Sequence, residues 1–288
     1  MKILLTGCAG QLGRELKRSL ASLGELVACD RRQLDLAKPE GLRDAVRAIK
    51  PSVIVNAAAF TAVDKAEGTP EAADAINGVA PGVLAEEAKS LGALLIHYST
   101  DYVFDGAKGS PYTEEDVPAP LAAYGRSKRA GELAIAASAA RQLVFRTSWV
   151  YGLHGANFMK TMLRLGRERD ELRVVGDQIG APTWTRHLAD VTAMILARRD
   201  LPNGLYHLAA AGETSWHGYA EAIFAEALQA GLIEKSPAVQ RITSADYPLP
   251  APRPANSRLD CSSFRRDFGL ALPDWRTGLI DCLADARF

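Results

Sequence analysis

The sequence predicts an α/β protein, a doubly wound parallel sheet with a smaller lobe formed by the C-terminal part of the chain. Two observations predict this class. Short apolar runs alternate with helical patterns from residue 2 to residue 147, which is typical of right-handed βαβ units. The first run also ends in a glycine-rich turn that leads into a helix. Beyond residue 147 the alternation loosens, so we expect a second unit to begin there.

Composition favours a soluble, cytoplasmic protein. Among 288 residues, 34 Lys and Arg balance 34 Asp and Glu, so the charge gives no reason to expect a nucleic-acid or membrane partner. No apolar run approaches the ~18 residues of a membrane span. The four cysteines are scattered without metal-ligand spacing, so we expect reduced thiols at Cys8, Cys29, Cys261 and Cys282.

Residues 2–6 form the first expected strand, and glycines follow it directly. The segment Gly7-Cys8-Ala9-Gly10-Gln11-Leu12-Gly13 precedes a helical pattern over residues 14–20. Small residues let a ligand approach the backbone, and the N-terminus of a helix attracts a pyrophosphate. The spacing is GxxGxxG rather than the more familiar GxGxxG, and the alternative is a glycine-rich connection with no ligand. Its place between a strand and a helix favours a Rossmann-like dinucleotide site.

The second expected strand, residues 25–29, ends where a dinucleotide fold meets the adenosine ribose. An acidic side chain there hydrogen-bonds a 2′-hydroxyl, whereas an arginine accommodates a 2′-phosphate. The segment Asp30-Arg31-Arg32 supplies both, so it does not distinguish NADH from NADPH. Neighbouring side chains of an extended turn point to opposite sides, so we expect one arginine to face the ribose. Asp35-Leu36 follows, either as an edge of the adenine site or as a helix cap.

Two later strands end in small or hydroxyl-bearing residues. Residues 51–56 run into Ala57-Ala58-Ala59, which either leave room for a ligand or let a helix pack closely. Residues 93–98 deliver Ser99-Thr100-Asp101 to the same edge of the sheet. A hydroxyl there either hydrogen-bonds a substrate carbonyl or forms a turn at the strand end.

Tyr124 and Lys128 lie four residues apart in the next helical pattern, so their side chains project from the same face. A free phenol has a pKa of about 10, and a nearby ammonium lowers this pKa toward the working range. The pair could therefore protonate a ketone oxygen while its carbon receives hydride. Alone, the spacing fits a half-buried tyrosine with a solvated lysine better, but the surrounding motifs favour chemistry.

The remaining elements follow from the same patterns. Prolines accumulate over residues 236–254, which predicts an irregular crossing segment, and the polar residues 62–67 are also expected to be irregular. The other expected helices cover residues 39–50, 71–91, 124–140, 158–169, 187–199, 216–228, 262–268 and 277–286, and the other expected strands cover residues 143–147 and 205–208.

These elements suggest two units. We expect residues 1–148 to bind the dinucleotide, joined by elements from residues 185–225. Residues 149–184 and 226–288 would then form a substrate-binding lobe over the edge of the sheet.

Together the motifs resemble the extended short-chain dehydrogenase/reductase superfamily. Its members combine an N-terminal GxxGxxG, a Ser or Thr after the fourth strand, and YxxxK on the following helix. More narrowly, the chain is similar to the dTDP-4-dehydrorhamnose reductase family. The narrower similarity is carried by residues 55–67, 99–106 and 253–259, and the whole resemblance spans nearly the entire chain.

The resemblance implies an oxidoreductase that uses NADPH, and NADH as well, to reduce the C4 keto group of dTDP-4-dehydro-L-rhamnose to dTDP-L-rhamnose. The catalytic residues would be Thr100, Tyr124 and Lys128, with Tyr124 as the proton donor. The substrate would contact Thr100, Asp101, Trp149 and Arg253. Besides Tyr124 and Lys128, the cofactor would contact Gly7, Gly10, Gln11, Leu12, Asp30, Arg31, Asp35, Leu36, Ala57, Ala59, Thr61 and Tyr98.

Two alternatives share these features. A nucleotide-sugar epimerase uses the same trio but keeps its NAD bound and returns the hydride. The regulatory subunits of eukaryotic methionine adenosyltransferase have the same fold without reductase activity. One departure concerns Mg²⁺, which some family members bind at a dimer interface through a glutamate shortly after residues 180–183. This chain has Arg186 there, so we expect no metal ligands. We expect a monomer or a weak homodimer. The expected binding partner is the dTDP-sugar substrate.

Overall fold

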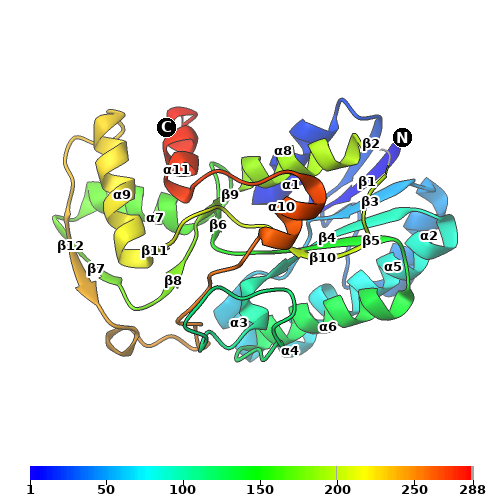
Figure 1. Ribbon diagram of the computed structural model, residues 1–288, viewed down its shortest axis with the longest axis horizontal. Coiled ribbons are helices and arrows are strands. Elements are labelled where there is room, and N and C mark those ends of the chain that lie inside the picture. The colour runs from blue at the N-terminus through cyan, green and yellow to red at the C-terminus, as the bar shows by residue number, and fades with distance from the viewer. Residues whose placement is uncertain (199, 287–288) are drawn as a thin grey trace.

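The computed structural model describes residues 1–198 and 200–286. Within them, six parallel strands form one sheet (Figure 1). Its order is β2 (Glu25–Cys29), β1 (Lys2–Thr6), β3 (Val53–Asn56), β4 (Leu94–Thr100), β5 (Gln142–Thr147) and β10 (Gly204–His207). The order reverses beside β1, and such a point forms a crevice at the carboxyl ends of the strands. The predicted doubly wound, Rossmann-like α/β class is confirmed.

Helices cover both faces of this sheet. Ile3 and Leu5 pack into one core and Leu4 into the other, because successive side chains of a strand point to opposite faces. The first face carries α1 (Gln11–Leu20), α8 (Thr185–Leu196) and α10 (Ser262–Phe268). The second face carries α2 (Pro39–Ile49), α5 (Ala80–Leu91) and α6 (Ala123–Ser138) (Figure 1).

The helix predicted over residues 71–91 contains a π-helical turn. It divides into α4 (Pro70–Asp74), the π turn η1 (Ala75–Val79) and α5. Asn77 of this turn is buried; its side chain accepts a hydrogen bond from the N–H of Phe60 at 2.8 Å and donates one to the Phe60 carbonyl at 3.0 Å. These bonds hold the segment that follows β3 at the edge of the sheet.

A third core makes up the second lobe, at the end of the molecule away from β1 (Figure 1). It includes Met159, Tyr219 and Phe224. The elements around it are α7 (Phe158–Glu168), β7 (Glu171–Val175), α9 (Trp216–Gln229), β12 (Ala238–Ile242) and α11 (Trp275–Ala284). Short strands connect the lobe to the sheet edge: β6 (Val150–Tyr151), β8 (Ile179–Gly180), β9 (Thr183–Trp184) and β11 (Thr214–Ser215). Among the described residues there are also two 3₁₀ turns, η2 (Asp101–Val103) and η3 (Ser244–Asp246).

Two segments expected to be irregular are regular. Residues 63–68 form α3 (Val63–Gly68), because Ala66 is buried against Ala73 and Ala123. The proline-rich segment contains β12, which pairs in parallel with β7 from Ala238 to Ile242. Both predictions were wrong because the stabilising contacts come from residues distant in the sequence. The prolines of that segment lie outside the strand itself.

The hydrophobic cores show how the helices after residue 184 are distributed between the sheet and the second lobe. Helix α8 packs on the main sheet and strand β10 belongs to it; both lie within residues 185–225, which we expect to join the dinucleotide-binding unit. Helix α9 instead packs in the second lobe, and α10 returns to the sheet through Phe264 and Phe268. The last part of the chain thus crosses between the two units.

Candidate functional site

A cleft of about 890 Å³ opens at the carboxyl edge of the sheet and reaches the second lobe. In the described part of the chain, every residue that the sequence suggests for the site lines this cleft except Arg253. Arg253 instead forms an ion pair with Asp64 of α3 at 2.7 Å. Its predicted contact with a substrate therefore lacks support from the cleft geometry.

The glycine turn closes tightly against the end of β3. Gly7 has a φ of +68°, and a Cβ there would lie 2.7 Å from the Cα of Ala58. A Cβ on Gly13 would lie 2.0 Å from the Gly7 carbonyl oxygen. Gly10 precedes α1 in an extended conformation and provides no side-chain cap. The turn thus presents the positive end of a helix dipole to the cleft, which fits a pyrophosphate.

One arginine faces the cleft at the end of β2. Arg31 lines it and lies 3.8 Å from Asp35, with 80% of its side chain exposed. Arg32 is not among the residues that line the cleft. The carboxylate of Asp30 accepts hydrogen bonds from the backbone N–H groups of Arg32 at 2.8 Å and Gln33 at 3.1 Å. The cleft therefore meets an exposed guanidinium at Arg31 and an Asp30 carboxylate that already accepts hydrogen bonds within its own turn.

Thr100 and Asp101 form the centre of the site. The Thr100 hydroxyl lies 3.1 Å from Asp101 Oδ1 and accepts from the N–H of Tyr102 at 3.2 Å. The neighbouring Ser99 turns away and donates to Glu132 at 2.6 Å. Asp101 Oδ2 is buried without a hydrogen-bond partner among the described residues, and burial raises the pKa of Asp101 to about 6. Hydrogen bonds with Ser257 and Thr100 oppose this rise in the pKa of Asp101.

Tyr124 is held in its protonated form. Burial raises its pKa to about 12, a hydrogen bond with Thr100 opposes this rise, and the charge of Asp101 adds to it. The expectation that Lys128 lowers this pKa is therefore not met in the ligand-free protein. The reason is the position of Lys128, whose Nζ lies 2.6 Å from the Tyr98 carbonyl oxygen and 3.0 Å from His97 Nε2.

Aromatic side chains form the opposite wall of the cleft. Trp149 has a φ of +47°, which is unusual for a bulky residue. Its indole stacks on that of Trp216, with centroids 3.6 Å apart and planes inclined by 10°. Phe158 packs against Trp216 at 4.7 Å. This wall offers flat apolar surface rather than hydrogen-bonding groups.

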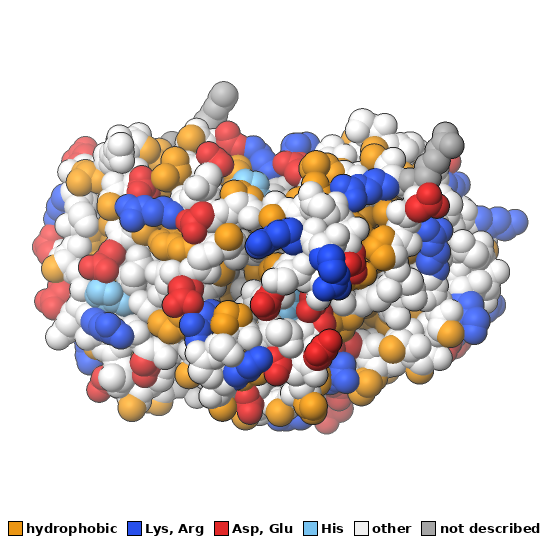
Figure 2. Space-filling view, in the orientation of Figure 1, with side chains coloured by type: hydrophobic (Ala, Val, Ile, Leu, Met, Phe, Trp, Pro, Cys, Tyr) orange, Lys and Arg blue, Asp and Glu red, His pale blue; other side chains and the backbone are white. Residues whose placement is uncertain are grey.

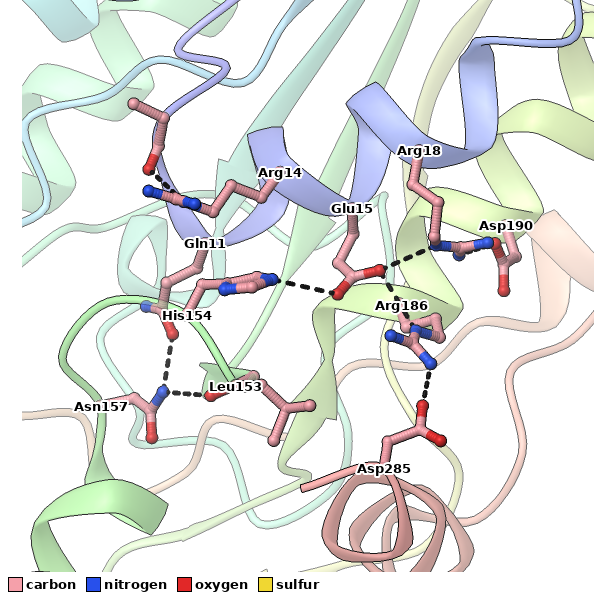
Figure 3. Close-up of polar contacts among 12 residues, drawn as sticks. Gln11, Arg14, Glu15, Arg18, Leu153, His154, Asn157, Arg186, Asp190 and Asp285 are labelled. Carbon is pink, nitrogen blue, oxygen red and sulfur yellow. Dashed lines mark hydrogen bonds and ion pairs between the residues drawn. The ribbon is translucent and has the colours of Figure 1, made fainter. Parts of the chain in front are cut away.

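A charged cluster surrounds Glu15 where α1, α8 and the end of α11 meet (Figure 3). Glu15 is buried, and its carboxylate lies 3.1 Å from Arg18 Nε and 3.2 Å from Arg186 Nε. Arg186 also pairs with Asp285, and Arg18 with Asp190. Across residues 1–198 and 200–286, no group of three or more His, Cys, Asp or Glu side chains is arranged to hold a metal ion.

The surface shows no strong segregation of charge on the face drawn in Figure 2, where basic and acidic side chains are intermixed. None of the described helices is both long and apolar enough to cross a membrane.

The chain is similar to known proteins over its whole length. A family model described as the RmlD substrate binding domain matches residues 1–288. A dTDP-4-dehydrorhamnose reductase from Burkholderia thailandensis is 49% identical over 294 residues, covering 99% of this chain and 99% of the relative. The chain belongs to the dTDP-4-dehydrorhamnose reductase family. Another reductase of this name, from Escherichia coli K12, is 49% identical over 287 residues, covering 97% of this chain and 96% of that one.

Solved structures of the family share the fold. A dTDP-4-dehydrorhamnose reductase from Bacillus anthracis, solved in complex with NADP, has a TM-score of 0.93 and 34% identity, with 99% of each chain covered. A UDP-glucose 4-epimerase from Thermus thermophilus, solved with NAD, has a TM-score of 0.82 over 100% of each chain at 19% identity. The second likeness supports the fold alone.

In this member of the dTDP-4-dehydrorhamnose reductase family, sequence reasoning missed several residues of the cleft. Asn157 donates hydrogen bonds to Gln11 at 2.8 Å and to the Gly152 carbonyl at 2.7 Å, joining the glycine turn to the second lobe (Figure 3). An Asn just before a helical pattern is a recognisable cap, and Asn157 does accept from the N–H of Lys160. Trp216, Phe158 and Tyr219 carry no comparable signal, because apolar aromatics usually indicate a core.

Proposed function

We propose that this protein reduces the C4 keto group of dTDP-4-dehydro-L-rhamnose to give dTDP-L-rhamnose, with NADPH as the reductant. The observation that carries the proposal is that Tyr124, Thr100 and Lys128 line the same cleft as the glycine turn. Membership of the reductase family supports the choice of substrate.

The residues of the cleft fit a dinucleotide. The turn around Gly7 and Gly10 would hold the pyrophosphate with Gln11 and Leu12, because it offers close backbone approach and a helix N-terminus. When bound, the nicotinamide supplies the hydride that adds to the carbonyl carbon. The adenosine end would meet Asp30, Arg31, Asp35 and Leu36, and the rest of the cofactor would meet Ala57, Ala59, Thr61 and Tyr98.

The side chains of this protein then handle the proton and orient the sugar. Tyr124 donates its proton to the carbonyl oxygen as negative charge develops there, and the Thr100 hydroxyl hydrogen-bonds the same oxygen. Asp101 lines the same cleft, and its carboxylate would accept a hydrogen bond from a sugar hydroxyl. Trp149 provides an apolar face for the ring.

Arg31 sets the coenzyme preference in this proposal. A 2′-phosphate carries nearly two negative charges at neutral pH, so Arg31 attracts it while Asp30 repels it. Arg31 is largely exposed, which keeps the attraction modest. We expect both coenzymes to be used, with NADPH preferred by less than about 30-fold in kcat/KM.

The test is oxidation of NADPH, with NADH run alongside, in the presence of dTDP-4-dehydro-L-rhamnose. We expect turnover with both coenzymes. Arg31→Ala should shift the preference toward NADH, whereas Arg32→Ala, the matched control outside the cleft lining, should leave the ratio unchanged. Strict use of NADH by the wild type would contradict the coenzyme assignment.

The same assay separates the alternatives. An epimerase would carry nicotinamide on purification and would not consume added NADPH. A regulatory subunit would co-purify with a catalytic partner and show no turnover. The expected monomer or weak homodimer and the cytoplasmic location stay predictions.

A further inference from the structure

A row of polar side chains crosses three adjacent strands directly beneath the site. Thr6 on β1 pairs with Asn56 on β3, and Asn56 pairs with His97 on β4, each as direct neighbours in the sheet register. The side chains are buried and bonded in the same order, Thr6 Oγ1 to Asn56 Oδ1 at 2.6 Å and Asn56 Nδ2 to His97 Nδ1 at 3.0 Å. The row ends at Lys128, whose Nζ lies 3.0 Å from His97 Nε2.

The backbone fixes the direction of these hydrogen bonds. The N–H of Ala58 donates to the side chain of Asn56 at 3.2 Å, and an N–H group can only donate. The atom that faces it must therefore be the amide oxygen of Asn56. The amino group of Asn56 then points at His97, so His97 Nδ1 must accept and cannot carry a proton.

This assignment constrains Lys128. Burial holds the pKa of His97 well below its ordinary value, so the ring is neutral. A neutral ring without a proton on Nδ1 carries it on Nε2. The group facing Lys128 is then an N–H donor, and an ammonium has no lone pair with which to accept. A neutral amine does.

A neutral Lys128 satisfies every contact of the row. Its lone pair accepts from His97 Nε2–H, one of its N–H groups donates to the Tyr98 carbonyl at 2.6 Å, and the other remains for the cleft that Lys128 lines. Burial lowers the pKa of Lys128 to about 8, and the charge of Glu132 opposes this change. The other titratable groups nearby are Tyr98, Tyr124 and Asp101, which line the same cleft, and Arg146, which is paired with Glu132.

We propose that His97 is a positioning residue that favours the neutral amine of Lys128 over its ammonium in the ligand-free protein, so that at alkaline pH binding of the nicotinamide coenzyme is coupled to the uptake of a proton by Lys128. The proton comes from the solvent and forms the fourth bond of Nζ. The reason for uptake is that the coenzyme brings negative charge and hydroxyl acceptors, which favour an ammonium over an amine. The inference rests on the proposed coenzyme site.

Isothermal titration calorimetry of NADH binding in buffers of different ionisation enthalpy tests this coupling without any turnover. NADH is used because the 2′-phosphate of NADPH titrates near pH 6 and would add its own protons. With the lysine half neutral at pH 8, the wild type should take up about 0.5 proton at pH 8, about 0.9 at pH 9 and almost none at pH 6.5.

Three variants test whether proton uptake depends on His97 and Lys128 themselves or only on the integrity of the fold. His97→Gln can turn its amide oxygen toward Lys128 and accept from an ammonium, so uptake at pH 8 should fall below about 0.2 proton. Lys128→Met should abolish uptake. His207→Gln is the matched control, a buried histidine whose Nε2 faces Arg146, and it should behave as the wild type.

The outcomes are distinct. Binding by the wild type without proton uptake at pH 8 and 9 would overturn the proposal, as would unchanged uptake in a folded His97→Gln protein, checked by circular dichroism. If His97→Gln fails to fold, the wild-type profile and Lys128→Met still decide whether Lys128 takes up the proton. Absence of binding by both NADH and NADPH would instead overturn the proposed function.

Discussion

Lys128 and Glu132 lie one turn apart on α6, and both are buried, yet their charges are compensated in opposite ways. The Glu132 carboxylate accepts from Arg146 at 2.8 and 2.7 Å, from Arg129 at 2.9 Å and from Ser99 at 2.6 Å. Lys128 contacts only a ring nitrogen and a carbonyl oxygen by hydrogen bonds among the described residues.

The pKa shifts follow from this difference. Burial alone would raise the pKa of Glu132, but Arg146, Ser99 and Arg129 together hold it below its ordinary value. For Lys128 burial prevails, and its pKa falls to about 8. Glu132 has positively charged partners, so it stays ionised near neutral pH. Lys128 has only neutral partners, so its protonation state can change. Helix α6 therefore carries Glu132, which stays ionised in its pair with Arg146, one turn after Lys128, whose protonation state can change. Of the two side chains, Lys128 is the one that lines the cleft.

The largest effect is expected at the cleft. Tyr124→Phe removes the proton donor, and a positioned general acid contributes about 10² to 10⁴ in rate, so kcat should fall by that factor. Affinity for NADPH should stay nearly unchanged, because the ring remains. Tyr102→Phe is the matched control, since Tyr102 lines the same cleft and packs edge-on against Tyr124. Steady-state kinetics and a binding titration measure both quantities; a Tyr124→Phe enzyme within a few-fold of wild type would remove the tyrosine from the mechanism.

A smaller effect, on stability, is expected from the ion pair. Glu132→Gln leaves the buried Arg146 without a charged partner, and breaking such a pair costs about 3 kcal/mol. Glu168→Gln, which removes the exposed partner of Arg164, should cost less than about 1 kcal/mol. Urea unfolding at pH 7 measures both values.

The pH dependence sharpens this comparison. Because the pKa of Glu132 is lower in the folded protein than its ordinary 4.5, its stabilisation is present above that value and is lost as pH falls through the folded pKa. The difference between the wild type and Glu132→Gln should therefore shrink below pH 4.5. A constant difference down to the acid transition would mean that packing, rather than charge, accounts for the loss.

The sequence was most informative where function depends on neighbours along the chain. The glycine turn and the pair Tyr124 and Lys128 could be recognised because a strand end, a helix start and a helical spacing are local features. The same reasoning located Thr100 and Asp101, since parallel strands end at one edge of the sheet.

Features that depend on register or on distant segments could not be predicted. His97 lies in an apolar strand and would be taken for a core residue; only the pairing of β1, β3 and β4 aligns it with Asn56 and Thr6. The pKa of Tyr124 was misjudged for the same reason, because Lys128 turns toward this row. Trp216 meets Trp149 only after α9 packs in the second lobe.

The smallest effect is expected from chelation, and it extends the comparison to Glu15. Like Glu132, Glu15 is a buried carboxylate, and guanidinium groups from α1 and α8 approach it at 3.1 and 3.2 Å (Figure 3). A carboxylate that already has two cationic partners gains little from a divalent cation, which would also be repelled by Arg18 and Arg186. EDTA should therefore leave activity and oligomeric state unchanged. In Arg186→Glu, however, three carboxylates would meet at this place, and added Mg²⁺ should raise the melting temperature of that variant while leaving the wild type unaffected. Loss of wild-type activity in EDTA, restored by Mg²⁺, would contradict this prediction. It would show that other carboxylates bind Mg²⁺, and that the positive charge of Arg18 and Arg186 next to Glu15 does not take the place of a metal ion.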